Sequence, residues 1–131
     1  MDQKGKSKRT QAERSAATQA KILEAAQNLI AERGLAHTST QDIARQAQVS
    51  RGAMLHHFPS RAVLIQATYA EMLRQESIRL REFARTLQPG QNRLKALTEY
   101  IWGRYQCGIF QVSMDYISEA RVDAEELAYV S

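Results

Sequence analysis

The sequence predicts an all-α fold, in which a three-helix unit is followed by a further group of helices. Apolar residues recur at the spacing of an amphipathic helix within residues 15–33 and again within 61–87. Between these stretches, residues 38–61 contain the capping residues and apolar faces of two short helices joined by a tight turn. Residues 88–91, with the sequence QPGQ, are a clear break, after which helical periodicity resumes.

Residues 1–14 are predicted to be a disordered basic tail. Positions 1–12 hold four Lys or Arg against a single Asp and offer no large apolar side chain to a core, so folding them would gain little. Two roles stay open for this tail. It is either a solvated extension that aids solubility, or a basic arm that contacts phosphates or enters a minor groove.

A long helix is predicted from about Ser15 to Arg33. Its apolar stripe consists of Ile22, Ala26, Leu29 and Ile30, with Ala25 at the edge. Gly34 follows at once and is expected to cap this helix in a left-handed conformation. Leu35 is expected to fill the gap beneath the next turn. The helix should pack across the two short helices and fix their angle.

The first short helix is predicted to follow a Ser39 cap, with Asp42 reaching back as its capping-box partner. Its narrow apolar face consists of Ile43, Ala44 and Ala47. The second short helix is predicted to begin at Arg51 after a Ser50 cap. Its inward side chains are Met54 and Phe58, with Leu55 beside them. Its first turn has small residues, which suits a major groove because bulky ones would hold the backbone away from base edges.

These two helices resemble the helix-turn-helix of the TetR family of bacterial transcriptional regulators. The shared pattern is DIAxxAxVSRGA over residues 42–53, followed by HHFxSR over 56–61. The likeness is strong over about 18–73 and weaker beyond; the alternative is an unrelated all-helical domain that matches by chance. The resemblance implies a DNA-binding domain at 15–75, with the helix-turn-helix at about 39–58 and its second helix in a major groove.

The predicted DNA-binding residues lie at the starts of the two short helices, along the second one, and at the start of the helix after it. They are Thr38, Ser39, Thr40, Ser50, Arg51, Gly52, Ala53, Leu55, His56, His57 and Arg61. Arg61 follows a Ser60 cap, so a cation and a helix N-terminus coincide at a place suited to a backbone phosphate. For His57, a role as a structural histidine is equally open.

Two residues depart from the family's pattern. Gln48 replaces a glycine in the turn, where a left-handed backbone is expected and a non-glycine residue costs about 1 kcal/mol. Leu55 stands where many relatives have a tyrosine. The phenol could donate to a phosphate, whereas leucine offers only an apolar contact with a sugar or a thymine methyl.

No catalytic, cofactor or metal site is predicted, and we do not expect an enzyme. His56 and His57 are neighbours on a helix and point about 100° apart, which makes them a poor pair of metal ligands. The remaining histidine, His37, has no cysteine near it. The sequence also lacks a Gly-rich phosphate loop and a nucleophile–base–acid set.

Residues 76–131 are predicted to be part of an effector-binding and dimerisation domain. A helix from Arg61 to about Leu87 leads into it, with an apolar stripe of Val63, Leu64, Ala67, Ala70, Leu73, Leu80, Ala84 and Leu87. Helices are then expected over about 92–105 and 109–120, with another starting at 123. Their inward residues are predicted to be Leu94, Leu97, Tyr100, Ile101, Phe110, Met114 and Ile117. Trp102 is expected either in the core or beside a ligand.

The charge is concentrated in the first half of the chain. Residues 1–61 carry a net charge of +5 and residues 62–131 a net charge of −1, which suggests a polyanion partner for the first half. The single cysteine excludes an internal disulfide. Because neither a membrane-spanning apolar run nor a secretory signal is present, we expect a cytoplasmic protein without a membrane partner.

The leading functional prediction is a sequence-specific DNA-binding transcriptional regulator, most often a repressor in this family. The resemblance implies a palindromic operator on double-stranded DNA, read by a two-fold homodimer and released when a small-molecule effector shifts the two reading helices apart. Relatives usually continue with two further helices that form the dimer interface, so a homodimer is doubtful for this chain. The alternative is a truncated, non-regulatory interaction fragment that binds DNA weakly and associates with an intact relative.

Overall fold

The computed structural model describes residues 10–129, which form six α-helices and no strand. The helices are α1 (Gln11–Arg33), α2 (Thr40–Ala47), α3 (Arg51–His57), α4 (Arg61–Thr86), α5 (Arg93–Arg104) and α6 (Phe110–Tyr129). A 3₁₀ turn, η1 (Leu35–His37), follows α1, and a π-helical turn, η2 (Tyr105–Ile109), joins α5 to α6. The predicted all-α class is confirmed. None of the helices within 10–129 combines the length and the apolar character that crossing a bilayer requires.

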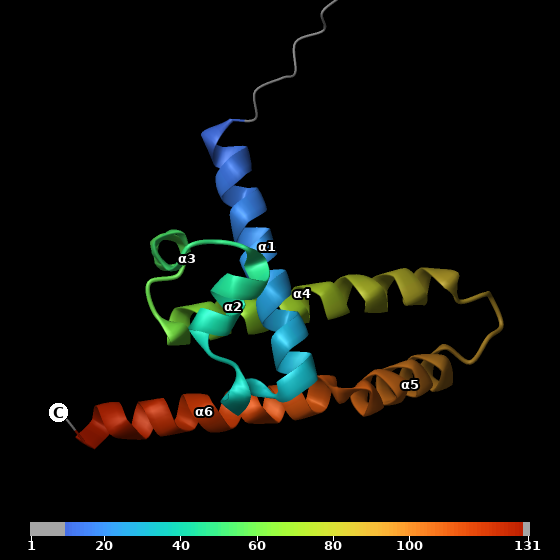
Figure 1. Cartoon of the computed structure of the whole chain (residues 1–131). Helices are drawn as coiled ribbons and strands as arrows, with labels where there is room; N and C mark the ends of the chain where they lie inside the picture. The colour runs from blue at the N-terminus through green and yellow to red at the C-terminus, as the bar shows by residue number, and fades with distance from the viewer. Residues whose placement is uncertain (1–9, 130–131) are drawn as a thin grey trace, which may run out of the picture.

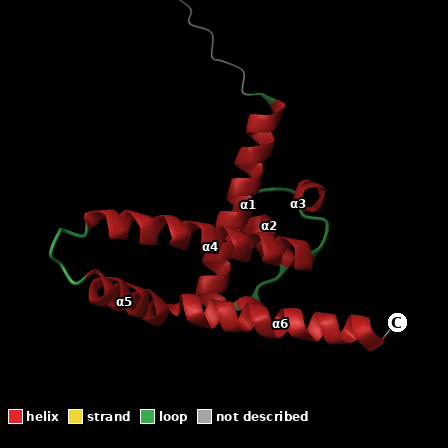
Figure 2. Ribbon diagram, turned by 180° about the vertical axis from the view of Figure 1, so that it is seen from behind, coloured by secondary structure: helices red, strands yellow, loops and turns green. Residues whose placement is uncertain are grey.

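Helices α2, α3, α4 and α6 are arranged around α1, whereas α5 lies farther away (Figure 1). Helix α1 crosses α4, while α2 packs against α1 and leads directly into α3. Beyond the 88–91 break the chain returns antiparallel to α4, and α6 passes the C-terminal end of α1 in both views (Figure 2). The second group of helices is therefore in contact with the three-helix unit at the end of α1 and the start of α4.

One hydrophobic core holds the first four helices together. It contains Ile22, Ala25, Ala26, Leu29, Ile43, Ala44, Ala47, Met54, Phe58 and Leu64, with Leu23, Val49 and Ala67 packed at its margin. Each fully buried large aliphatic side chain stabilises such a core by about 1.5–3 kcal/mol. The predicted apolar faces of α1, α2 and α3 are therefore confirmed.

A second, smaller cluster connects this core to α6. It contains the buried side chains of Ile30, Leu35 and Ile65, against which Val112 and Tyr116 of α6 pack. Leu35, which was expected beneath the turn between the short helices, belongs to this second cluster instead.

The start of α1 differs from the prediction. The helix begins at Gln11 and not near residue 15, because Thr10 and Glu13 form a capping box. The Thr10 N–H donates to Glu13 Oε2 at 2.8 Å, and the Glu13 N–H donates to Thr10 Oγ1 at 3.2 Å. The predicted disordered tail of 1–14 is therefore helical over 11–14, and its part over 1–9 lies outside the described residues.

The end of α1 also differs in detail. Gly34 has the predicted positive φ of 85°, but its ψ of 161° is extended and not left-handed helical. Its N–H nevertheless donates to the Ile30 carbonyl oxygen at 2.8 Å, which satisfies one of the last acceptors of the helix.

The predicted inward stripe of α4 is confirmed at Leu64 and Ala67 but is wrong at other positions. Leu64, Ile65 and Thr68 are buried, whereas Val63 is 42% exposed and Leu73 is 46% exposed. The buried residues of α4 all lie in its first two turns, where α1 and α6 pack against it, and these neighbours select a face that includes Ile65 and Thr68 but not Val63.

Among the residues predicted to face inward on α5 and α6, Leu97 and Tyr100 are half-buried, but the others are exposed. Leu94, Ile101 and Trp102 are 77%, 53% and 60% exposed, so Trp102 lies in neither a core nor an enclosed site and only stacks on Tyr105 at 5.4 Å. The expected inward residues of α6 are also exposed: Phe110, Met114 and Ile117. Helix α6 continues without a break to Tyr129, so no new helix starts at 123. Within the described residues, these helices are covered on one side only.

Candidate DNA-binding surface

The start of α2 is fixed by its cap. Ser39 Oγ accepts a hydrogen bond from the Asp42 N–H at 3.1 Å, as predicted, and donates to Asp42 Oδ2 at 2.9 Å. The Asp42 carboxylate therefore binds the Ser39 hydroxyl and not the Ser39 N–H that a capping box requires. It also lies 3.4 Å from Arg33 and 3.5 Å from Arg45.

The turn between α2 and α3 depends on Gln48. This residue is left-handed as predicted, with φ 56° and ψ 42°, and its N–H donates to the Arg45 carbonyl oxygen at 3.2 Å. The chain thereby leaves α2 within one residue and reaches Ser50. Ser50 Oγ accepts from the Ala53 N–H at 3.0 Å and so caps α3.

Helix α3 has one buried and one open side. Met54 is 1% exposed and Phe58, which caps the helix end, is 7% exposed, so both anchor the helix on the core. The open side is formed by the exposed Arg51, Gly52, Leu55 and His56, with Ala53 half-buried beside them. We call these five residues the outer face of α3.

Gly52 is not required by the fold itself. A Cβ atom added there would meet no other atom within 4 Å, and the backbone is that of an ordinary α-helix. Glycine within a helix is less favourable than alanine by up to about 1 kcal/mol. Gly52 therefore leaves the helix backbone uncovered on the outer face, and neither packing nor backbone conformation within the chain requires a glycine there.

Three of the predicted DNA-binding hydroxyl groups are engaged within the fold. Thr38 is 3% exposed and donates from Oγ1 to the Gly34 carbonyl oxygen at 2.8 Å, so its hydroxyl already has a partner within the fold. Ser39 and Ser50 are exposed, but both hydroxyls serve as helix caps. Thr40 is half-buried at the start of α2.

Arg61, which the sequence places beside a backbone phosphate, is engaged within the fold. Its Nη2 donates to the Leu35 carbonyl oxygen at 3.1 Å, and its Nη1 lies 3.4 Å from Glu119 Oε1 on α6. The expected phosphate contact is therefore not prepared in this arrangement. Glu119 was missed as a functional candidate, because no local pattern indicates that a residue so distant in sequence reaches Arg61.

The two adjacent histidines have different surroundings. His57 Nδ1 lies 3.4 Å from Gln19 Nε2 on α1, which favours the structural role left open for this histidine. His56 is exposed. Arg51 is also exposed and forms no hydrogen bond or ion pair with any residue that the structure describes. Arg51 and His56 are thus the polar side chains available on the outer face.

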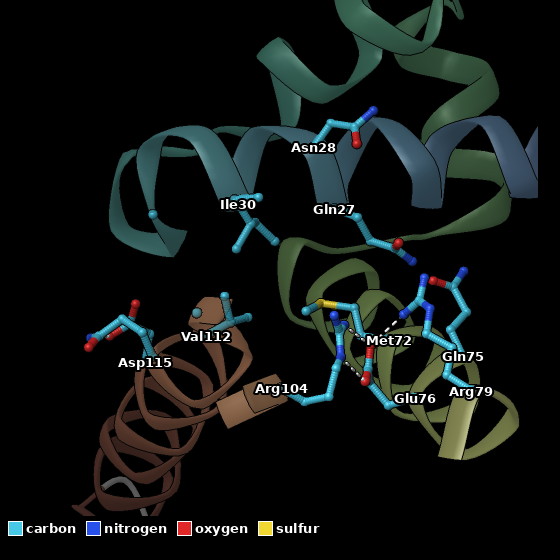
Figure 3. A pocket seen from close by; sticks show the side chains of 14 residues that line it. Gln27, Asn28, Ile30, Met72, Gln75, Glu76, Arg79, Arg104, Val112 and Asp115 are labelled. Carbon is cyan, nitrogen blue, oxygen red and sulfur yellow. Dashed lines mark hydrogen bonds and ion pairs between the residues drawn. The ribbon is translucent and has the colours of Figure 1, made fainter. Parts of the chain in front are cut away.

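Two of the cavities in the part of the chain that the structure describes are lined by residues of α4 and α6. One, of about 490 Å³, lies between α1, α4 and α6 and is lined by polar side chains that include Gln27, Gln75 and Asp115 (Figure 3). The other, of about 460 Å³, lies between α4, α5 and α6 and is lined mainly by apolar and aromatic residues, including Leu80, Tyr100 and Phe110.

An ion cluster separates these cavities and connects α4 to the end of α5. Glu76 accepts from Arg104 Nε at 2.9 Å and also binds Arg79 (Figure 3). The hydrogen bonds from Arg104, followed by those from Arg79, lower the pKa of the Glu76 carboxyl despite its partial burial. The side chain is therefore a carboxylate at neutral pH.

Comparison with known proteins shows which family the helix-turn-helix resembles. The family described as "Bacterial regulatory proteins, tetR family" matches residues 22–68. The HTH-type transcriptional regulator CymR of Pseudomonas putida is 34% identical over 116 residues, which are 88% of this chain and 57% of CymR. The three-helix unit of this chain is a TetR-family domain.

The TetR-family likeness is strongest in the three-helix unit. The HTH-type transcriptional regulator TtgR, also of Pseudomonas putida, is 48% identical over 50 residues, which are 38% of this chain and 24% of TtgR. The probable HTH-type transcriptional regulator ArpR of Pseudomonas putida matches to the same extent. The chain thus spans little more than half of CymR and about a quarter of the other two.

Proposed function

We propose that this chain is a DNA-binding transcriptional regulator that recognises a specific sequence through the outer face of α3. The observation that carries this proposal is Gly52, which lies in open space on a capped and well-anchored helix. A helix enters the major groove closely only where its side chains are small, and Gly52 and Ala53 provide such a surface.

The neighbouring side chains supply the other contacts that a groove requires. Arg51 has no partner among the described residues and can bind guanine or a phosphate. Leu55, which is 41% exposed, can contact a thymine methyl. The positive charge of the first half of the chain favours association with DNA of any sequence.

The regulatory role is part of the same proposal and is supported by the relatives, which are named as transcriptional regulators. In it, the protein is a repressor that binds a palindromic operator as a pair of chains, and a small molecule releases the DNA. The cavity between α4, α5 and α6 supports a mostly apolar effector, because its lining is rich in aromatic side chains. A cytoplasmic location accords with access to chromosomal DNA.

Selection of bound duplexes from a random pool tests this proposal, followed by affinity measurements on the selected site. Gly52→Leu should abolish the preference for the selected site, since the larger side chain holds α3 away from the bases. Gly103→Leu is the matched control, because Gly103 is also helical and open but lies on α5. Failure to enrich any sequence, or equal losses in both variants, would contradict the proposal.

A further inference from the structure

Arg61, the first residue of α4, is held by groups from two other parts of the fold. Its Nη2 binds the Leu35 carbonyl oxygen of η1, and its Nη1 lies 3.4 Å from Glu119 Oε1. The side chain therefore connects the start of α4 both to the turn after α1 and to α6.

Glu119 is placed by a packed helix face. Val112, Tyr116 and Glu119 follow each other at four- and three-residue intervals, so they lie on one side of α6. Val112 and Tyr116 pack into the second hydrophobic cluster, and the ring of Tyr116 stacks on Tyr69 with centroids 4.3 Å apart. Figure 3 shows Val112 facing Ile30 of α1 across this contact. Any displacement of α6 must therefore move Glu119 relative to Arg61.

The guanidinium of Arg61 does not use all of its hydrogen-bond donors within the fold. Nη1 is buried but makes no hydrogen bond, because its contact with Glu119 has the distance of an ion pair without the geometry of a hydrogen bond. The side chains of Arg61 and Glu119 are 36% and 37% exposed, so solvent screens their attraction. A phosphate oxygen can therefore compete with Glu119 for this guanidinium.

We infer that Glu119 lowers the affinity of the protein for DNA by holding Arg61 away from a backbone phosphate. This inference rests on the proposed function and adds a regulatory residue to it. When α6 is docked, Arg61 is bound to Glu119; when α6 withdraws, Arg61 is released to the phosphate beside the N-terminus of α4. The position is suited to that second partner, because the positive end of the helix dipole lies there too.

The test measures binding of the full chain to a fluorescent duplex of mixed sequence over a salt series. Glu119→Gln should tighten binding by about two- to fivefold, the equilibrium equivalent of losing an exposed ion pair. It should also steepen the log–log salt dependence by about 0.9, the value for one additional phosphate contact. Asp115→Asn is the matched control, since it removes the same charge one turn away, where the carboxylate binds Gln111 at 2.9 Å.

The same measurements in an Arg61→Ala background complete the design. There Glu119→Gln should change neither the affinity nor the salt slope. Equal gains from the two α6 variants, or a gain that persists without Arg61, would overturn the inference and leave the proposed function intact. If no variant binds the duplex even at low salt, the proposed function is rejected as well.

Discussion

Replacing Phe58 with alanine removes the side chain that fixes the end of α3 on the core. The ring is 7% exposed and packs with residues of α1, α2 and α4. Truncation of an enclosed phenylalanine costs about 3–5 kcal/mol, which combines the lost transfer free energy with the cavity left behind. Since small domains have only about 5–15 kcal/mol of stability, this one change should remove a large part of it.

Chemical denaturation followed by circular dichroism measures this loss directly. Leu55→Ala is the control, because Leu55 is near Phe58 on the same helix but 41% exposed, and surface substitutions usually change stability by no more than about 0.5 kcal/mol. The packing argument is refuted if the two variants lose similar amounts of stability, or if Phe58→Ala costs less than about 1 kcal/mol.

Three further outcomes follow from particular contacts. Arg51→Ala should weaken binding to duplex DNA and, if Arg51 binds a phosphate, lower the log–log salt slope by about 0.9 in a titration over salt; an unchanged affinity would contradict the role of Arg51. Glu76→Gln should destabilise the chain by about 1–3 kcal/mol in thermal or chemical unfolding, because Arg104 and Arg79 lose a charged acceptor; a neutral result would show that the cluster does not hold α5 on α4. The hydrogen bond from the Arg74 side chain lowers the pKa of Glu71 from 4.5 to about 2. Because the pKa is lower in the folded state than in the unfolded state, the ionised Glu71 stabilises the fold fully above about pH 4.5, and this stabilisation is lost as the pH falls towards 2. Glu71→Gln should remove that part of the acid dependence of the melting temperature, and an identical pH profile would exclude it.

Local signals made the three-helix unit predictable. The serine caps at 39, 50 and 60 and the apolar faces of α1 and α2 are set by residues within a few positions of each other. The left-handed Gln48 was expected from the resemblance to the TetR family, in which a glycine usually occupies this position of the turn. Such features depend little on the rest of the chain, so the sequence alone indicates them.

Surroundings that depend on the folded chain were not predictable in the same way. Thr38 looks like an exposed hydroxyl in a polar run, yet the short turn η1 directs it onto the carbonyl oxygen of Gly34, only four positions earlier in the chain. Arg61 looks like a free cation until α6 brings Glu119 to it. Periodicity along α4 and α5 likewise does not show which side a neighbouring helix covers, and this explains why Leu73 and Leu94 are exposed.

Major-groove protection on the selected duplex tests the central claim, that the outer face of α3 reads DNA. Dimethyl sulfate methylates guanine N7, which lies in the major groove. The protein should protect guanines within the selected site, and Ala53→Glu should remove that protection, since it places a carboxylate among phosphates and base acceptors. Unprotected guanines beneath a bound protein, or protection that survives Ala53→Glu, would contradict the claim.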